Sequence, residues 1–477
     1  MAKYLSLKEV FSQGEKLIDQ EVELKGWIRS VRNSKTFSFV VLNDGSSQAN
    51  IQIIADSSLE NYGPVSSMLS GTSVIINGII KPSGGKGQSI EMLAKSVTIV
   101  GPANEEFPLQ KKSTSLEFLR EIAHLRSRTQ TFGAIWRIRN SLQFATHKFF
   151  NERGYINIHT PIITALDAEG AGEMFKVTTL HLDNLPKDEK KQVDYSQDYF
   201  GQETSLSVSG QLQAEAMAIG LGKVYTFGPT FRSENSNTKR HLSEFWMVEP
   251  EVAFFDLDQV AELAAEYIKY LINYALENCM DELLFLNHRP MEKGGVLGAS
   301  INEKENYIEE IRKVANATFV KITYTEAMDI CSKSGKKFEF PTNWGAEMQT
   351  EHERYLAEEY YKGPVIVTDY PKAFKAFYMK QNPDGKTVRA MDILVPGVGE
   401  IVGGSQREDD LEKLQNAIKE KKMNDKDLWW YLELRKWGSV PHGGFGLGFE
   451  RALLYITGMT NVRDIIPFPR APKNAAF

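Results

Sequence analysis

The sequence predicts an α+β protein with a small β-barrel at its N-terminus and a larger domain built on an antiparallel sheet flanked by helices. Three observations support this fold class. The chain has 477 residues, which is enough for two or three domains with an ample core. Five β-rich runs crowd into positions 20–101. Beyond position 128, strand-like and helix-like segments alternate without the regular spacing of βαβ units.

Turn-forming sequences separate the five β-rich runs, among them NDGS at 43–46 and PSGGKG at 82–87. Five strands over this length suit an OB-fold, a barrel that often binds single-stranded nucleic acid, although another small β-barrel with a structural role would give the same pattern. We expect an OB-fold domain at 1–102, a hinge linker at 103–128 and the larger domain at 129–477. The five runs read VELKGWIRSV, FSFVVLN, NIQIIA, TSVIINGII and IEMLAKSVTIV.

The linker and the residues after it are rich in basic side chains. Between positions 111 and 140, seven Lys and Arg stand against two Glu. Such a segment beside a barrel could follow a phosphate backbone, although a solvated surface gives the same pattern. The net charge of the chain is −6, so any contact with nucleic acid would use a local basic face.

Cysteine usage and the N-terminus indicate a cytoplasmic protein. Cys279 and Cys331 lie far apart and have no CxxC partner, so we expect neither a disulfide framework nor a zinc site. The first residues, MAKYLSLKEVFSQ, lack the apolar core of a signal peptide, and no apolar run of 18 residues appears. We therefore expect no association with a membrane.

The larger domain opens with a helix. Apolar residues recur every three or four positions across 128–154, and Gly154 is a plausible stop. The next run, YINIHTPIIT, is β-rich but contains Pro161, which cannot donate to a ladder, so we expect a strand at an edge or an interface. Further helices are expected at 257–278, 304–314 and 408–422. The periodic apolar residues of the first helix are Phe132, Ile135, Ile138, Leu142, Ala145 and Phe149.

A hairpin with a long basic loop is predicted at 231–251, which reads FRSENSNTKRHLSEFWMVEPE. Arg232 and Glu234 lie two apart and should share one side of a strand. An arginine fork suits a phosphate, and a nearby carboxylate can accept from an exocyclic amine. Phe245 on the returning strand could stack on a base, and His241 could hold outer phosphates. An exposed hairpin with a cross-strand ion pair is the alternative.

A glycine-rich run, HGGFGLGFERALLY, occupies 442–455. It lacks the GxGxxG spacing of a dinucleotide loop with an acidic residue about 20 positions further on. The glycines instead let a backbone lie close under a flat ligand, and they lead into a helix that carries Arg451, a candidate clamp for a terminal phosphate. A glycine-rich turn from strand to helix without any ligand is the alternative.

These segments together resemble the three motifs of class II aminoacyl-tRNA synthetases. FRSE…EFWMVEPE resembles motif 2, GFGLGFERALL resembles motif 3, and the helix with YINIHTPII resembles motif 1. A preceding OB barrel is typical of the subgroup that charges aspartate, asparagine or lysine. The resemblance covers essentially the whole chain. It implies a homodimer joined through motif 1, with ATP and Mg²⁺ as cofactors and tRNA as the partner.

The resemblance also implies how ATP would be held. Such enzymes join an amino acid to ATP, release pyrophosphate, and pass the acyl group to the terminal ribose of tRNA by positioning and charge stabilisation. Arg232 would hold the α-phosphate and the amino-acid carboxylate, Glu234 the adenine amine, and Phe245 would stack on adenine. The remaining roles fall to His241 and Arg451 for the outer phosphates, and to Asp392 and Glu400 for Mg²⁺.

The expected amino acid is asparagine. The loop DAEGAGEMF resembles the family loop whose glutamate binds the α-amino group, which makes Glu169 the candidate. Arg407 stands where the family keeps an arginine for the side chain. Aspartate enzymes read QSPQ followed by a lysine; here Gln211 is followed by Ala214 at the lysine position and then by Glu215. A missing cation and an added anion would repel aspartate and accept the amide NH₂, unless Glu215 faces solvent.

In the barrel, Phe39 and Gln52 stand where the subgroup stacks on and reads the central anticodon base. A core phenylalanine and a solvated amide are the alternatives. The sequence thus predicts an enzyme that charges tRNA(Asn) with L-asparagine. The rivals are an aspartate enzyme, a ligase that makes free asparagine on the same fold, and an inactive relative that only binds RNA.

Overall fold

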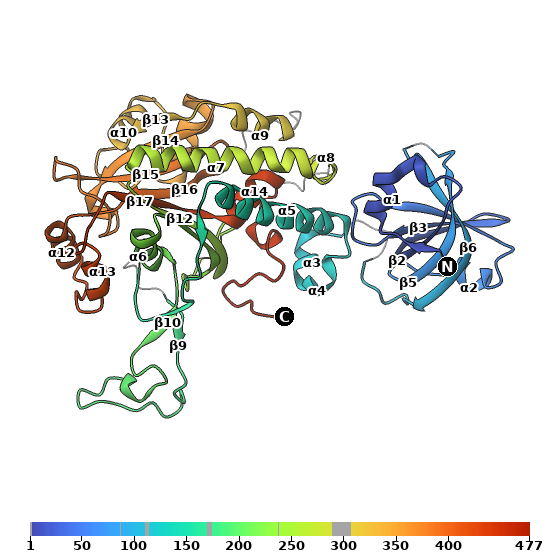
Figure 1. Cartoon of the computed structure of the whole chain (residues 1–477), viewed down its shortest axis with the longest axis horizontal. Helices are drawn as coiled ribbons and strands as arrows, with labels where there is room; N and C mark the ends of the chain where they lie inside the picture. Colours follow the sequence, from blue (N-terminus) through green and yellow to red (C-terminus); the bar gives the residue numbers. More distant parts are fainter. Residues whose placement is uncertain (1, 86, 110–113, 169–173, 237, 289–306) are drawn as a thin grey trace. The chain divides into compact units, whose positions relative to one another are not determined.

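The computed structural model describes residues 2–85, 87–109, 114–168, 174–236, 238–288 and 307–477. The chain divides into two compact units, Met1–Ala134 and Ile135–Phe477. We describe each unit by itself (Figure 1). The narrower boundaries expected at 102 and 128 remain predictions.

The first unit contains the predicted five-stranded barrel. Neighbouring strands follow the order β2–β3–β4–β6–β5, and β5 pairs back onto β2, which closes the barrel. Apolar residues alternate inward, so Val40 and Ile53 are fully buried while Phe39 and Gln52 face outward on β3 and β4. The predicted OB-fold is confirmed. Its strands are β2 (Glu21–Asn33), β3 (Phe37–Asn43), β4 (Ile51–Asp56), β5 (Ser73–Pro82) and β6 (Ile90–Gly101).

Short elements complete this unit. The strand β1 pairs in parallel with β2, and α1 begins with a capping box in which Ser6 and Glu9 cap each other. The elements are β1 (Lys3–Tyr4), α1 (Leu7–Gln13), η1 (Gly14–Leu17), α2 (Tyr62–Ser66), α3 (Leu116–Glu121) and α4 (Ala123–Arg126).

The second unit is built on a sheet of eight strands within the described residues, in the order β13–β14–β15–β16–β17–β12–β11–β7. The six inner strands are antiparallel, as predicted, whereas the edge strands β13 and β7 run parallel to their neighbours. The strands are β7 (Ile156–Asn157), β11 (Lys223–Phe231), β12 (Glu244–Ala253), β13 (Val320–Thr323), β14 (Val365–Pro371), β15 (Thr387–Val395), β16 (Gly399–Gln406) and β17 (His442–Gly448).

The prediction of one strand across 155–164 is wrong. Only Ile156 and Asn157 pair with the large sheet, and the chain then leaves it. A second short strand, β8 (Ile163–Thr164), joins β9 (Lys176–Val177) and β10 (Thr204–Leu206) in a separate small sheet. Pro161 lies between the two pieces, where no ladder needs its missing N–H.

Helices cover both faces of the large sheet. The first, α5 (Gln130–Glu152), follows the predicted pattern: its six periodic apolar residues are all fully buried, and Gly154 after it has a φ of +76°. The helix predicted at 257–278 is α7 (Leu257–Asn278), and the one at 408–422 is the shorter α12 (Leu411–Glu420). The helix expected at 304–314 appears as α9 (Tyr307–Asn316), with its first predicted residues outside the described ones.

The remaining helical elements are α6 (Gln211–Leu221), α8 (Met280–Asn287), α10 (Tyr324–Lys333), α11 (Thr350–Arg354), the π-helical turn η3 (Tyr355–Tyr360), α13 (Trp429–Glu433) and α14 (Phe449–Thr457), with short 3₁₀ turns η2 (Tyr195–Gln197), η4 (Lys372–Phe374) and η5 (Val462–Asp464).

The two faces of the sheet have different functions. Figure 1 shows α7 on one side of the strands and α6 on the other. On β17, a side-chain carbon at Gly443 would meet Val260 of α7, whereas one at Gly444 would meet Glu251 of β12. The face with α7 is therefore packed core. The opposite face, towards which Gly444 and Glu251 point, bounds an open cleft.

Candidate active site

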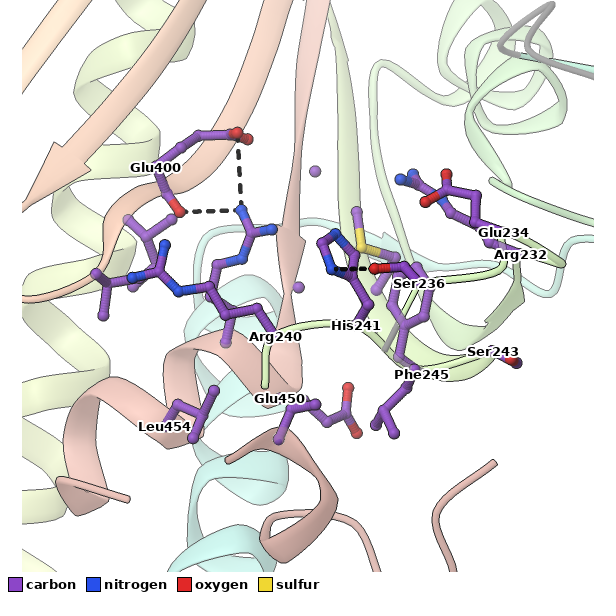
Figure 2. A pocket seen from close by; sticks show the side chains of 18 of the residues that line it. Arg232, Glu234, Ser236, Arg240, His241, Ser243, Phe245, Glu400, Glu450 and Leu454 are labelled. Carbon is purple, nitrogen blue, oxygen red and sulfur yellow. Dashed lines mark hydrogen bonds and ion pairs between the residues drawn. The ribbon is translucent and has the colours of Figure 1, made fainter. Parts of the chain in front are cut away.

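Two adjoining cavities form the cleft, with volumes of about 180 and 220 Å³. They share four lining residues, Arg232, Met247, Glu400 and Gly446, so a single ligand could span both. Figure 2 shows the first cavity, with Arg232 and Glu234 on one side and Glu400 on the other. After the ligands that the sequence resemblance predicts, we refer to this cavity as the nucleotide cavity and to the second as the amino-acid cavity.

The nucleotide cavity brings together all six residues that the resemblance assigned to ATP: Arg232, Glu234, His241, Phe245, Glu400 and Arg451. One detail of the prediction is wrong. The strand β11 ends at Phe231, so Arg232 and Glu234 belong to the hairpin loop rather than to a strand. The amide N–H of Arg232 still donates to the Ser243 carbonyl (3.0 Å), which holds the base of the loop closed.

An arginine and an aromatic ring lie together on one wall. The guanidinium carbon of Arg232 is 5.4 Å from the centre of the Phe245 ring. Both side chains line the cavity, so an aromatic ring and a charged fork can contact one ligand, which suits a base and a phosphate of one molecule.

Burial lowers the pKa of His241, and the nearby charges of Arg451, Arg232 and Arg240 lower it further, against the opposing effect of Glu234. His241 Nδ1 lies 3.1 Å from the hydroxyl of Ser236 (Figure 2). Near neutral pH this side chain is therefore a neutral hydrogen-bonding group, and the positive charge on this wall comes from the arginines. Arg240 was not singled out from the sequence.

Arg451 projects from the first turn of α14 into the same cavity. Its Nη1 donates to the Glu400 carbonyl at 2.9 Å and lies 3.7 Å from the Glu400 carboxylate. The side chain remains 36% exposed. It is thus anchored at the rim and open to a ligand.

Asp392 and Glu400 lie on the neighbouring strands β15 and β16, and their carboxylates converge above Gly403. A carbon added at Gly403 would be 3.2 Å from Glu400 Oε1 and 3.4 Å from Asp392 Oδ1. Lys375 also approaches, with Nζ 3.1 Å from Asp392 Oδ2. In the described part of the chain, no cluster of three or more His, Cys, Asp or Glu could hold a metal. Two hard oxygen donors nonetheless fit Mg²⁺, which completes its shell with phosphate and water.

Glu353 of α11 supports Glu400 from behind. Its Oε2 accepts from the amide N–H of Glu400 at 3.1 Å, and a side chain at Gly399 would collide with it. Burial, reinforced by the negative charge of Glu400, raises the pKa of Glu353 to about 7. No sequence pattern points to this residue, because its position depends on how α11 packs against β15 and β16.

The amino-acid cavity contains two of the four residues predicted to bind the amino acid, Gln211 and Arg407. Arg407 is 3% exposed and makes a two-point contact with Glu251 through Nε (3.2 Å) and Nη2. Its Nη1 also donates to the Ser405 hydroxyl at 2.6 Å. Burial would lower the pKa of Arg407, but the charge and hydrogen bonds of Glu251, together with the charge of Glu215, raise it above its ordinary value. The arginine charge that would attract aspartate is therefore already matched by a carboxylate.

The structure does not support Glu215 as a direct contact to the amide. Glu215 is fully buried beneath the cavity and does not line it. Its carboxylate accepts from Gln211 (3.0 Å), Tyr431 (2.7 Å) and Arg435 (2.9 Å) and contacts His442 Nε2 (3.0 Å). An acceptor with four partners of its own has no room for the substrate amide.

Four acidic residues line this cavity, Glu249, Glu251, Asp392 and Glu400, and the sequence interpretation missed the first two. A signal was available, because Phe245, Met247, Glu249 and Glu251 alternate along β12 and all line the cleft. Ser209 and the amide of Gly210 (3.1 Å) donate to Glu249. Burial raises the pKa of Glu249, and these hydrogen bonds oppose that shift.

The remaining predicted residues fall elsewhere. Glu169 lies outside the described residues. Phe39 and Gln52 lie on the outer surface of the barrel in the first unit. The Arg32 guanidinium is 4.8 Å from the centre of the Phe39 ring, and Gln52 Nε2 donates to Glu91 at 2.9 Å. A stacking ring, a cation and an amide on one barrel surface suit a single-stranded nucleotide.

Known proteins resemble the chain over its full length. The family model for class II tRNA synthetases (D, K and N) matches residues 115–472, and the model for an OB-fold nucleic acid binding domain matches 22–100. The chain belongs to the class II tRNA synthetases. The family and fold class predicted from the sequence are confirmed. Asparagine–tRNA ligases of Cytophaga hutchinsonii and Clostridium tetani are 54% and 52% identical, with 100% of each chain covered.

Among solved structures, the asparaginyl-tRNA synthetase from Pyrococcus horikoshii complexed with asparaginyl-adenylate is similar to this synthetase with a TM-score of 0.85. It is 31% identical, and the match covers 100% of both chains. Within the residues described for this synthetase, no helix combines the length and apolarity needed to cross a membrane.

Proposed function

We propose that this class II synthetase is an asparagine–tRNA ligase. It activates L-asparagine with ATP to asparaginyl-adenylate and pyrophosphate, and then transfers the asparaginyl group to the 3′-terminal ribose of tRNA(Asn). The observation that carries the proposal is the pair of adjoining cavities. The nucleotide cavity, which suits a base and phosphates, opens into the amino-acid cavity, where Arg407 is paired with the carboxylate of Glu251. The names of the full-length relatives agree with it.

The nucleotide cavity accounts for the first step. Arg232 holds the α-phosphate and the substrate carboxylate, and Glu234 accepts from the adenine amine while Phe245 stacks on the ring. Arg451 and His241 hold the outer phosphates, so ATP is bent and its α-phosphorus is exposed to the amino-acid cavity. Bound Mg²⁺, held by Asp392 and Glu400, would neutralise phosphate charge.

The amino-acid cavity selects the side chain. Arg407 donates to the amide oxygen, and Glu249 or Glu251 accepts from the amide NH₂, while Gln211 completes the wall. Aspartate would place a third carboxylate beside Glu249 and Glu251 without a new cation, which disfavours it. Glu169 remains the proposed partner of the α-amino group.

The barrel binds the anticodon through Phe39 and Gln52. The homodimer is proposed to form through α5 and the segment around β7, where Phe144 (61% exposed), Ile156 and Ile163 leave an apolar surface open. The cytoplasm is the proposed location, since tRNA is found there.

Amino-acid-dependent ATP–pyrophosphate exchange without tRNA tests the proposal. Strong exchange with asparagine, and exchange with aspartate at least about a hundredfold weaker in kcat/KM, is the expected result, because a misplaced buried charge costs several kcal/mol. Exchange with aspartate instead would identify an aspartate enzyme. Free asparagine formed from aspartate and ammonia would identify the amide-forming ligase, and no exchange with or without tRNA would favour the RNA-binding relative.

Phe39→Ala tests anticodon binding by the barrel independently of adenylate formation in the second unit. Loss of one stacked base is expected to lower kcat/KM for tRNA(Asn) charging by about 5- to 100-fold, since base stacking contributes roughly 1–3 kcal/mol. Pyrophosphate exchange without tRNA should be unchanged. Phe340→Ala, which removes an exposed ring (46%) of the second unit that lines neither cavity, serves as the matched control. Equal charging by the Phe39 and Phe340 variants would contradict the anticodon assignment.

A further inference from the structure

A buried polar cluster lies directly beneath the amino-acid cavity, and the catalytic assignments above leave its function open. We call it the Glu215 cluster; it consists of Glu215, Tyr431, Arg435 and His442. The four side chains come from α6, α13 and the segment after it, and β17. The side chains of Glu215 and Arg435 are both fully buried. Such a buried charged pair calls for a functional explanation, because the free-energy cost of removing two charges from water often exceeds the attraction between them.

The Glu215 cluster touches the cavity at two points. Glu215 Oε1 accepts from Gln211 Nε2 at 3.0 Å and lies 3.8 Å from Arg407 Nε. Gln211 and Arg407 both line the amino-acid cavity. The orientation of these two polar groups therefore depends on where the Glu215 carboxylate lies, although Glu215 itself is out of reach of a ligand.

Arg435 holds that carboxylate in place. Its Nη2 donates to Glu215 Oε2 at 2.9 Å and lies 3.0 Å from the Tyr431 hydroxyl oxygen, while its Nε donates to the Glu408 carbonyl at 2.8 Å. Glu408 follows Arg407 in the chain. The Arg435 guanidinium thus holds both the Glu215 side chain, which lies below Arg407, and the backbone of Glu408, which follows Arg407.

Arg435 supplies one of the two guanidinium groups that face the buried acids of this region. Arg407 contacts Glu251 and Arg435 contacts Glu215, and both acids are fully buried. Burial raises the pKa of Glu251 to about 8, and the charge of Arg407 opposes that shift. Burial alone would raise the pKa of Glu215, but the charge of Arg435, followed by His442 and Arg407, lowers it below its ordinary value. Without Arg435, Glu215 would take a proton or draw Arg407 towards itself, and either change would disturb the cavity.

We propose that Arg435 is a positioning residue for amino-acid selection, which anchors Glu215 so that Gln211 and Arg407 are held in the geometry that reads the asparagine side chain. This inference rests on the proposed function, because it takes asparagine as the substrate of the cavity. It assigns a specificity role to the chain around α13, which makes no contact with the nucleotide cavity among its lining residues.

The test compares KM for asparagine with KM for ATP in pyrophosphate exchange. Arg435→Met keeps the length of the side chain but removes its charge and hydrogen bonds, and it should raise KM for asparagine at least tenfold while KM for ATP changes less than twofold. Arg435→Lys restores the charge and should keep KM for asparagine within about fivefold of wild type. A merely structural role would instead reduce the active fraction and the Tm, with both KM values unchanged.

Arg312→Met is the control for losing an arginine, because it breaks an ion pair with Glu309 (3.4 Å) on α9 and Arg312 lines neither cavity. It should leave KM for asparagine unchanged. If Arg435→Met does not fold, Tyr431→Phe decides: removing the hydroxyl that donates to Glu215 should raise KM for asparagine about threefold and leave KM for ATP unchanged.

Unchanged KM for asparagine in Arg435→Met, or in Tyr431→Phe if the first variant is insoluble, would overturn the inference. Wild-type protein is measured in the same series. Absence of asparagine-dependent exchange in wild type would refute the proposed function, whereas normal wild-type exchange with unaltered variants would refute only the positioning role.

Discussion

Arg451→Ala is expected to abolish adenylate formation, with pyrophosphate exchange about a thousandfold below wild type. The side chain enters the nucleotide cavity from α14 and is anchored to the Glu400 carbonyl at 2.9 Å. Loss of one charged donor aimed at the reacting phosphates typically lowers the rate by about 10²–10³-fold. A second loss adds to this, because Glu400 loses its neighbouring cation.

The fold should survive this change. The Arg451 side chain is 36% exposed, and the contact that it makes with the Glu400 carboxylate at 3.7 Å is of the kind that contributes about 0–1 kcal/mol at a surface. The buried side of α14, which includes Leu453 and Ile456, is untouched. Thermal unfolding should therefore shift by no more than a few degrees.

Arg312→Ala is the control for losing a surface arginine. Arg312 lies on α9 beside Glu309 at 3.4 Å and does not line either cavity. Its exchange activity should equal that of wild type. Near-normal exchange by Arg451→Ala would mean that this side chain does not contact the phosphates, and the assignment of the motif 3 arginine would fail.

The parts of the fold that the sequence predicted well are those that carry a strong local signal. The helix α7 has a continuous apolar stripe and a capping box at Asp256 and Gln259, and its predicted bounds match the structure. The barrel strands alternate cleanly and are separated by turn sequences. The prediction of one strand across 155–164 was wrong because β-propensity is a local property of the sequence. Tertiary contacts decide which sheet the residues on either side of Pro161 join.

The nucleotide cavity was predictable for a related reason. Most of its residues come from two short stretches, 232–247 and 446–462, in which strand, loop and helix are neighbours in the chain, and a third stretch contributes Val398, Glu400 and Ile401. Arg232, Phe245 and Arg451 could therefore be singled out without knowledge of the packing. The amino-acid cavity is assembled from α6, β12, β15, β16 and β17. Glu215 would contact the ligand only if its side of α6 faced the cavity. The spacing of residues in the sequence does not determine which side of the helix is buried.

The sequence interpretation was wrong to place Glu215 in direct contact with the substrate amide. Glu215 can still influence the choice of amino acid indirectly, through the residues that it holds. The charge that the sequence placed at this position is present but paired below the cavity, and the two carboxylates that lie beside Arg407 in the lining come from alternate positions of β12. In the proposed function, selection of a neutral amide depends on the carboxylates around Arg407, a property of several side chains that no single substitution in a motif reveals.

Gly444→Ala is expected to destabilise the fold by about 3 kcal/mol or more and to lower asparagine-dependent exchange at least about a hundredfold. An added carbon would lie 2.2 Å from the Pro250 carbonyl oxygen and 2.4 Å from the Glu251 carboxylate. The first contact is with backbone paired between β12 and β17, which cannot move without parting the two strands. Overpacking of this kind typically costs about 1–3 kcal/mol, occasionally more.

The contact between the added carbon and Glu251 explains why we expect asparagine-dependent exchange to fall by more than the loss of folding stability alone would cause. If Glu251 moves aside, Arg407 loses its two-point partner and the asparagine site loses its charge balance. Gly220→Ala is the control, since Gly220 lies exposed in α6 with nothing within 4 Å of the added carbon. It should stabilise the protein by about 0.5–1 kcal/mol and leave exchange unchanged. Wild-type Tm and wild-type KM for asparagine in Gly444→Ala would show that β12 and β17 are less tightly packed than these distances require.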